Sequence, residues 1–161
     1  MSTVVIPTPN LDLVLQTPEE ALAWVETLSP EDRAEVSEVW LERARATKPG
    51  DYWALGFRVV ERATGVTVGG CAFKGPPDAE GSVEIAYGID EPYRCRGFAT
   101  EAAAALAQFA WADERVHLVQ AHTRSDNEAS ARVLAKCGFR FIGPVLDPED
   151  GPVDRWGQNP V

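Results

Sequence analysis

The chain has 161 residues, of which 45% are apolar and 25% charged, as in a globular protein of one domain. Its 15 Lys and Arg against 25 Asp and Glu give a net charge of −10, which argues against binding to the phosphate backbone of nucleic acids. No apolar run reaches the ~18 residues of a membrane-spanning helix. Met1–Asn10 also lacks the pattern of a signal peptide. We therefore expect a cytoplasmic location, with no nucleic-acid and no membrane partner.

The cysteines and histidines predict no metal site and no disulfide framework. Cys71, Cys95 and Cys137 are odd in number, widely spaced and form no Cys-x-x-Cys pair, so reduced thiols are the simplest interpretation. His117 and His122 lie five residues apart on one predicted strand. That spacing sends them to opposite faces, so they cannot share a metal ion.

The N-terminal part of the chain predicts one strand followed by two helices. Leu11–Leu15 has the alternation of a strand. Thr17-Pro18-Glu19-Glu20 is a helix start in which Thr17 and Glu20 form a capping box. Ser29-Pro30-Glu31-Asp32 repeats this pattern, and the second helix runs to about Ala46, before Pro49-Gly50.

The middle of the chain predicts three strands in succession. Trp53–Arg62 and Val66–Lys74 form a hairpin around the turn residues Ala63-Thr64-Gly65. Ser82–Asp90 follows as a fourth strand, and its alternation points one set of side chains toward the core, namely Val83, Ile85, Tyr87 and Ile89. Glu84 points the other way.

The C-terminal half predicts helices and strands in alternation. We expect an Ala-rich helix over Gly97–Ala112, a strand over Val116–Thr123, a helix from Asp126 or Asn127 to Gly138, and strands over Phe139–Leu146 and Val153–Trp156. The fold class is α+β, with one mixed sheet of about seven strands flanked by about four helices. The fourth and fifth strands should be parallel, because a helix connects them.

The junction from Glu91 to Glu101 carries the clearest chemical pattern. A strand ends there and a helix begins, and the unpaired amides of a helix start bind anions. Gly97 and Ala99 are small enough to let a phosphate approach the backbone. Two arginines, Arg94 and Arg96, oppose the helix dipole unless an anion lies between them. The alternative is an ordinary turn with two solvated arginines.

Three motifs resemble those of one known family, in order, between about Phe57 and Gly143. Arg94–Ala99 fits the Q/R-x-x-G-x-G/A motif of the GNAT superfamily of acyl-CoA-dependent N-acetyltransferases. Val83–Ile89 resembles the strand that precedes this motif. Asn127–Leu134, followed by Cys137-Gly138-Phe139, resembles the N-x-x-S-x-x-x-L…GF segment of the branch that includes ribosomal-protein N-terminal acetyltransferases.

The resemblance implies a three-layer fold with a V-shaped split between the fourth and fifth strands. A single N-acetyltransferase-like domain would cover residues 1–161, with an arm and helices over 1–50, an acyl-CoA-binding core over about 53–143, and C-terminal strands and a tail over 144–161. Acetyl-CoA would be the acyl donor, and a homodimer is compatible with the family.

The resemblance also implies the cofactor contacts. The expected residues are Ile85, Tyr87, Ile89, Arg94, Cys95, Arg96, Gly97, Phe98, Ala99, Thr100 and Asn127. The commonest loop of the family has glycine where this chain has Cys95. A side chain there either crowds the loop or is accommodated by a backbone at negative φ, and we expect pyrophosphate binding to survive.

Two residues are the catalytic candidates. Glu84 would help to take a proton from the amine, and Ser130 would donate to the departing coenzyme A sulfur. Their structural alternatives are an ion pair for Glu84 and a serine bonded to the helix backbone for Ser130. Asn127 would cap the helix, and Trp40 and Trp53 are weaker candidates on the acceptor side.

The expected function is acetyl transfer from acetyl-CoA to a primary amine by direct attack in a ternary complex. A non-catalytic acyl-CoA-binding or regulatory module on the same fold is the alternative. A protein N-terminus, a polyamine and an aminoglycoside remain open as acceptors. The acidic helices near the N-terminus are either a solvated face or a surface that favours a cationic acceptor.

Overall fold

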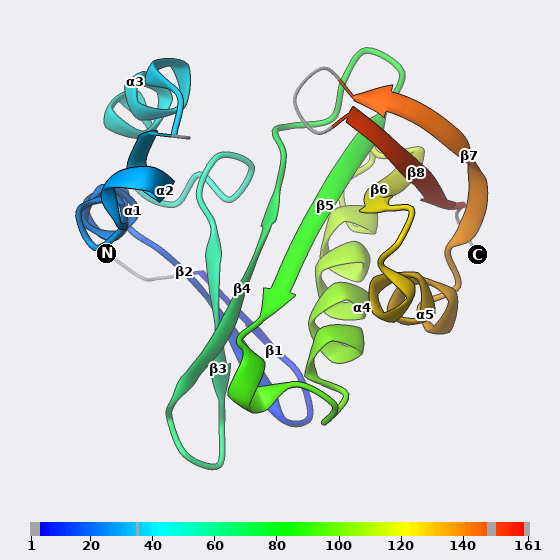
Figure 1. Ribbon diagram of the computed structural model, residues 1–161, viewed down its shortest axis with the longest axis horizontal. Helices are drawn as coiled ribbons and strands as arrows, with labels where there is room; N and C mark the ends of the chain where they lie inside the picture. The colour runs from blue at the N-terminus through cyan, green and yellow to red at the C-terminus, as the bar shows by residue number, and fades with distance from the viewer. Residues whose placement is uncertain (1–3, 35, 148–150, 160–161) are drawn as a thin grey trace.

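The computed structural model describes residues 4–34, 36–147 and 151–159, and these residues form an α+β fold (Figure 1). Eight strands of the described residues form one mixed sheet in the order β1-β2-β3-β4-β5-β6-β8-β7. They are β1 (Val5–Pro7), β2 (Leu11–Leu15), β3 (Phe57–Glu61), β4 (Thr67–Phe73), β5 (Ser82–Ile89), β6 (Leu118–Arg124), β7 (Arg140–Asp147) and β8 (Gly151–Gln158). The helices are α1 (Pro18–Glu26), α2 (Pro30–Ala34), α3 (Glu38–Ala46), α4 (Phe98–Trp111) and α5 (Glu128–Lys136).

The sheet opens between β5 and β6. These strands are parallel, as expected, but their Cα partners in the described residues run only from Ser82↔Leu118 to Glu84↔Gln120. Beyond that point β5 stays paired with β4 as far as Ile89, and β6 stays paired with β8 as far as Arg124. The expected V-shaped split is therefore confirmed, with Glu84 at its apex.

Helix α4 forms the core together with the sheet. Its buried face consists of Phe98, Ala102, Ala103, Leu106, Ala107 and Ala110. The alanines recur at helical spacing, and their small side chains let the helix axis approach the strands closely. Figure 1 shows α4 running alongside β5, with α5 beside it and the three N-terminal helices grouped away from both. This packing fixes the start of α4 next to the end of β5.

Two differences from the expected elements have local causes. β1 was not predicted, since three residues are too few to show a period, and it brings the sheet from seven strands to eight by pairing with β2. β3 begins at Phe57 rather than Trp53, because the amide of Leu55 donates to the carbonyl of Asp51 and that of Trp53 donates to its carboxylate. The backbone of this segment is thereby folded into a turn.

Two further predictions were wrong in extent. The second predicted helix is two helices, α2 and α3, which makes five α-helices in the described residues rather than four. The last strand, β8, is longer than expected and inserts between β6 and β7.

The predicted helix boundaries have the expected chemistry. Thr17 Oγ1 accepts from the amide of Glu20 at 3.0 Å, and Glu20 Oε1 accepts from the amide of Thr17 at 3.3 Å, which confirms the capping box. Asn127 Oδ1 accepts from the amide of Ser130 at 3.0 Å and caps α5. Gly138, at φ +83°, ends the same helix in the left-handed region. No helix in the described residues is long and apolar enough to cross a membrane.

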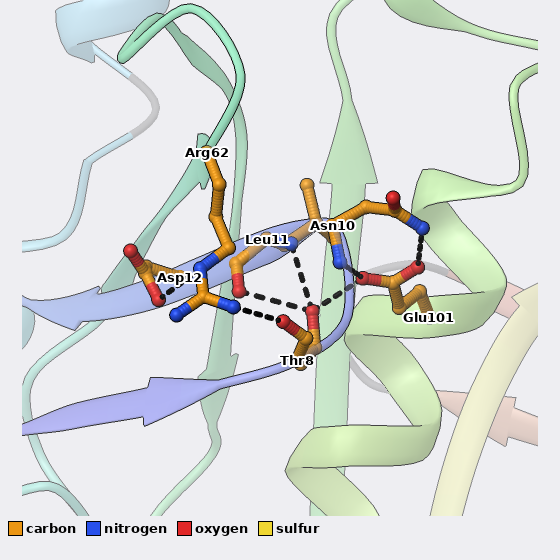
Figure 2. A network of polar contacts seen from close by, with 6 residues as sticks. All are labelled: Thr8, Asn10, Leu11, Asp12, Arg62 and Glu101. Atoms are coloured by element: carbon orange, nitrogen blue, oxygen red, sulfur yellow. Dashed lines mark hydrogen bonds and ion pairs between the residues drawn. The ribbon is translucent and has the colours of Figure 1, made fainter.

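A carboxylate in the first turn of α4 holds the turn between β1 and β2 (Figure 2). Glu101 accepts hydrogen bonds from the Thr8 hydroxyl, from the amide of Asn10 at 2.8 Å and from the Asn10 side chain at 2.9 Å. Arg62 on the other side of the turn donates to the carbonyl of Thr8 at 3.1 Å and pairs with Asp12 at 3.3 Å. The outer hairpin of the sheet is thus tied to the helix that begins at the split.

These contacts set the ionisation of Glu101. Desolvation pushes its pKa upward, but the hydrogen bonds from Thr8, Asn10 and Leu11 together outweigh that effect and hold the pKa below its ordinary value of 4.5. A carboxyl group whose pKa is lowered by folding contributes stability above its unfolded pKa. That contribution is lost as the pH falls through the folded value.

We expect Glu101→Gln to lower the free energy of unfolding at neutral pH by about 1 kcal/mol, since solvent screens part of the charge. The difference from the parent protein should shrink as the pH falls from the ordinary carboxyl value through the lower folded pKa of Glu101, because the folded parent protein then also becomes uncharged at this position. Urea unfolding at a series of pH values measures it. Glu128→Gln is a matched control, because Glu128 also lies in a helix first turn but is highly exposed. An equal loss in both variants would contradict the tether.

Candidate functional site

The loop between β5 and α4 contains two residues in the left-handed region. Cys95 lies at φ +67° and Gly97 at φ +82°. Of the two alternatives for Cys95, accommodation by a backbone at negative φ is therefore not the one found. The chain needs a positive φ here to turn from the short 3₁₀ segment Glu91–Tyr93 into α4, a conformation that costs a residue with a Cβ atom about 1–2 kcal/mol.

The two arginines of the loop have different surroundings. Arg94 Nε donates to the carbonyl of Ile89 at 2.8 Å and fastens the loop to the end of β5. The Arg96 guanidinium lies 5.9 Å from the ring centre of Tyr93, which is partly buried against the core, in a cation–π contact. Both arginines are exposed, but Arg94 is held by its hydrogen bond to Ile89, so Arg96 at the helix start is the better placed to meet an anion.

The first turn of α4 is suited to an anion. Gly97 is the N-cap residue and has no side chain to cap the helix. The amides of Phe98, Ala99 and Thr100 have no partner within the helix, and the helix dipole adds a partial positive charge. A pyrophosphate, with several oxygens, fits such a row of donors.

The side chains of several expected cofactor residues face the core. Ile85, Ile89 and Phe98 are all buried to 7% exposure or less. Only their backbone groups are therefore available to a ligand. Tyr87 is different, since its side chain reaches from β5 to α5.

Tyr87 and Ser130 form a hydroxyl pair. Their oxygen atoms lie 2.8 Å apart, and either can be the donor. Burial raises the pKa of the Tyr87 hydroxyl above its ordinary value, and the hydrogen bond with Ser130 offsets part of that rise. Both groups are thus protonated at neutral pH. Sequence reasoning placed Tyr87 on the correct strand face but missed this pairing, which requires knowing where α5 lies.

Glu84 is held between two basic side chains at the apex of the split. Oε2 lies 2.9 Å from Lys74 Nζ, and Oε1 lies 2.9 Å from His122 Nδ1. The carboxylate is only 18% exposed. Lys74 and His122 were not predicted as site residues. The pairing of Glu84 with Gln120 puts His122 on the same face two residues further on, so correct strand register would have revealed it.

A cleft of about 550 Å³ opens beside this cluster. The described residues that line it are Lys74, His122, Thr123, Arg124, Ser125, Asp126, Pro152 and Val153. Since alternate residues of a strand face opposite sides, Glu84 and Tyr87 project to the two sides of β5. The structure therefore does not bring Glu84 and Ser130 into contact, but places them at opposite faces of β5, with Ser130 on the face of Tyr87.

The two tryptophans expected on the acceptor side do not contribute to this cleft as far as the structure describes them. Trp53 packs against the core, with its ring 4.7 Å from that of Phe73 and 5.1 Å from that of Tyr52. Trp40 belongs to α3, and its side chain lies outside the described residues.

Comparison with known proteins identifies related sequences and folds. A family model described as an acetyltransferase (GNAT) domain matches residues 8–140. The uncharacterized N-acetyltransferase YjdG of Bacillus subtilis (strain 168) is 33% identical over 116 residues, which cover 72% of this chain and 64% of that protein. The chain thus spans less than two thirds of the length of the curated relatives it matches.

Solved structures share the fold at lower sequence identity. A putative ribosomal-protein-serine acetyltransferase from Vibrio cholerae is 23% identical, with 98% of both chains covered and a TM-score of 0.68. RimL, a ribosomal L7/L12 alpha-N-protein acetyltransferase solved in complex with coenzyme A, is 17% identical, with 97% of this chain and 98% of that chain covered and a TM-score of 0.71.

We expect Cys95→Gly to stabilise the protein by about 0.5–1 kcal/mol. Glycine adopts the left-handed conformation without strain. The free energy gained in this way is larger than the entropic cost of ordering glycine, which is more flexible in the unfolded chain. Urea unfolding under reducing conditions measures the change. Cys95→Ala is the matched control, because it removes the thiol but keeps the Cβ atom. A gain of the same size in the control would show that strain at this position is not the cause.

Proposed function

We propose that this chain, which belongs to the GNAT acetyltransferase family, transfers an acetyl group from acetyl-CoA to a primary amine by direct attack in a ternary complex. The observation that carries the proposal is the split beyond Glu84↔Gln120, which leads to the uncapped start of α4. An extended arm ending in a pyrophosphate has the shape and the polar groups that this arrangement accepts.

The donor would lie along the opened strand edges. The pantetheine arm carries two amide groups, which would pair with the backbone of Ile85–Ile89 and Ala121–Arg124 as a further strand does. The pyrophosphate would bind the amides of Phe98, Ala99 and Thr100, with Arg96 beside it. A backbone amide of β5 would polarise the thioester carbonyl and stabilise the oxyanion.

The reaction needs one proton removed and one supplied. The neutral amine nitrogen attacks the thioester carbon and forms the new C–N bond, and the C–S bond then breaks. The leaving sulfur takes a proton from the hydroxyl pair of Tyr87 and Ser130. The nitrogen, acidic once the C–N bond has formed, loses one proton to solvent, and the hydroxyl pair regains one from solvent. Glu84, with the basic groups around it, lies on the amine side.

The cleft favours an acceptor with a single amine. Lys74 and Arg124 line it together with Asp126, so it does not share the strong negative charge of the whole chain. A polyamine or an aminoglycoside would bring several positive charges toward these two cations. A peptide N-terminus brings one, and we propose this acceptor class above the other two.

The first test is thermal unfolding with acetyl-CoA, CoA, ATP and NAD, each in excess. A ligand at about 100 times its dissociation constant adds about 2.7 kcal/mol, or roughly 5–10 °C for a chain of this length. We expect a shift with the two CoA species only. Release of free thiol is then followed with a peptide that begins with serine, with spermidine and with ribostamycin. A CoA-dependent shift without thiol release in any assay would favour the non-catalytic binding module.

We expect Ser130→Ala to lower kcat about tenfold, and the double change Ser130→Ala with Tyr87→Phe to lower it about 100-fold or more. The hydroxyls act on the leaving sulfur, so the thermal shift with acetyl-CoA should remain within a degree or two of that of the parent protein. Tyr52→Phe removes a tyrosine hydroxyl away from the split and serves as control. Equal losses of turnover and of acetyl-CoA binding would contradict this role.

A further inference from the structure

We infer that His122, rather than Glu84, takes the proton from the attacking amine, and that Glu84 is the positioning residue that orients it. This inference rests on the proposed function and names the base that the proposed reaction requires. It also assigns a role to a side chain that sequence reasoning considered only as a metal ligand.

The first observation is that both oxygens of Glu84 are engaged. One lies against the Lys74 ammonium group and the other against the His122 ring, each at 2.9 Å. A proton on either oxygen would therefore replace one of these contacts. The geometry of Glu84 is that of a residue that orients Lys74 and His122.

The second observation concerns access to the cleft. Lys74 and His122 line it, whereas Glu84 is absent from the described residues that do so. Lys74 is cationic and paired with Glu84, so it is not available as a base. The side chains of His122 and Glu84 are exposed to a similar extent, 14% and 18%, so the distinction is that the imidazole lines the cleft in which an amine would lie.

The third observation concerns the two ring nitrogens of His122. Nδ1 is shielded from solvent and lies 2.9 Å from Glu84 Oε1, at an angle outside that of a good hydrogen bond. Nε2 accepts from Arg155 Nε at 3.4 Å, near the upper limit for a hydrogen bond. Because Nε2 accepts this hydrogen bond it carries a lone pair, which leaves the proton of the neutral ring on Nδ1, beside the carboxylate. The contact with Arg155 is weak enough for an amine to displace it.

The proton transfer to His122 precedes the attack on the thioester. An N–H bond of the ammonium form of the acceptor breaks, its proton joins Nε2, and the electron pair stays on the amine nitrogen for attack on the thioester. The imidazolium formed lies against the Glu84 carboxylate, which stabilises it. The other charged groups of the cleft and the ring are Lys74 after β4, Arg155 on β8, Arg124 on β6 and Asp126 after it. The Glu84 carboxylate is the negative charge in contact with the ring, at 2.9 Å.

The tautomer of His122 tests this arrangement without any assay of activity. The chain contains two histidines, and His117 is exposed. Long-range ¹H–¹⁵N correlation spectra of the full chain and of His117→Gln therefore assign the signals of the His122 ring by difference. At about pH 8 we expect the Nδ1–H form for His122. An Nε2–H form would overturn the inference. In Glu84→Gln we expect a mixture of the two forms, and an unchanged tautomer would overturn the positioning role.

Kinetics with the serine-initiated peptide and acetyl-CoA supply the second test. We expect His122→Gln to lower kcat about 100-fold or more, with KM for acetyl-CoA changed less than about threefold. His117→Gln should leave both unchanged. Loss of turnover in Glu84→Gln but not in His122→Gln would overturn the inference and leave the proposed function intact. No turnover by the parent protein with the peptide, spermidine or ribostamycin would overturn the proposed function instead, while the tautomer still decides the geometry around His122.

Discussion

The divergence of two parallel strands is the constraint on which the rest of the structure depends. Parallel strands in a sheet normally satisfy each other's backbone groups, and here they do so only from Ser82↔Leu118 to Glu84↔Gln120. Beyond that point each strand stays paired with its other neighbour, β5 with β4 and β6 with β8. The opening is therefore held by the sheet itself, and α4 fixes where it ends.

Local chemistry made part of this structure predictable. Some helix boundaries depend only on residues within one turn, so they can be predicted from the sequence. These are the helix starts at Thr17 and Asn127 and the helix end at Gly138. The alternation in β5 assigned Glu84 and Tyr87 to opposite faces for the same reason. The parallel pairing of β5 and β6 followed from their helical connection.

The remaining features depend on contacts between distant segments. The partners of Glu84 come from β4 and β6, so they follow only once the strand register is known. Ser130 meets Tyr87 across 43 residues, and Glu101 meets Thr8 across 93. The left-handed conformation of Cys95 was missed because thiol side chains rarely adopt it, and the chain direction required by α4 overrides that preference. For Glu84, the ion pair considered as a structural alternative is present, and the proposed chemistry makes use of it.

The donors at the start of α4 have a consequence for how this site can change during evolution. Because they are main-chain amides, every residue except proline provides one, and substitutions at Ala99 or Thr100 leave the row of donors in place. Sequence drift at these positions is thus tolerated as long as the backbone path is kept. The site is instead vulnerable at Gly97, whose φ of +82° other residues adopt only under strain. Retention of the site during evolution therefore depends more on the backbone conformation than on the identity of the side chains.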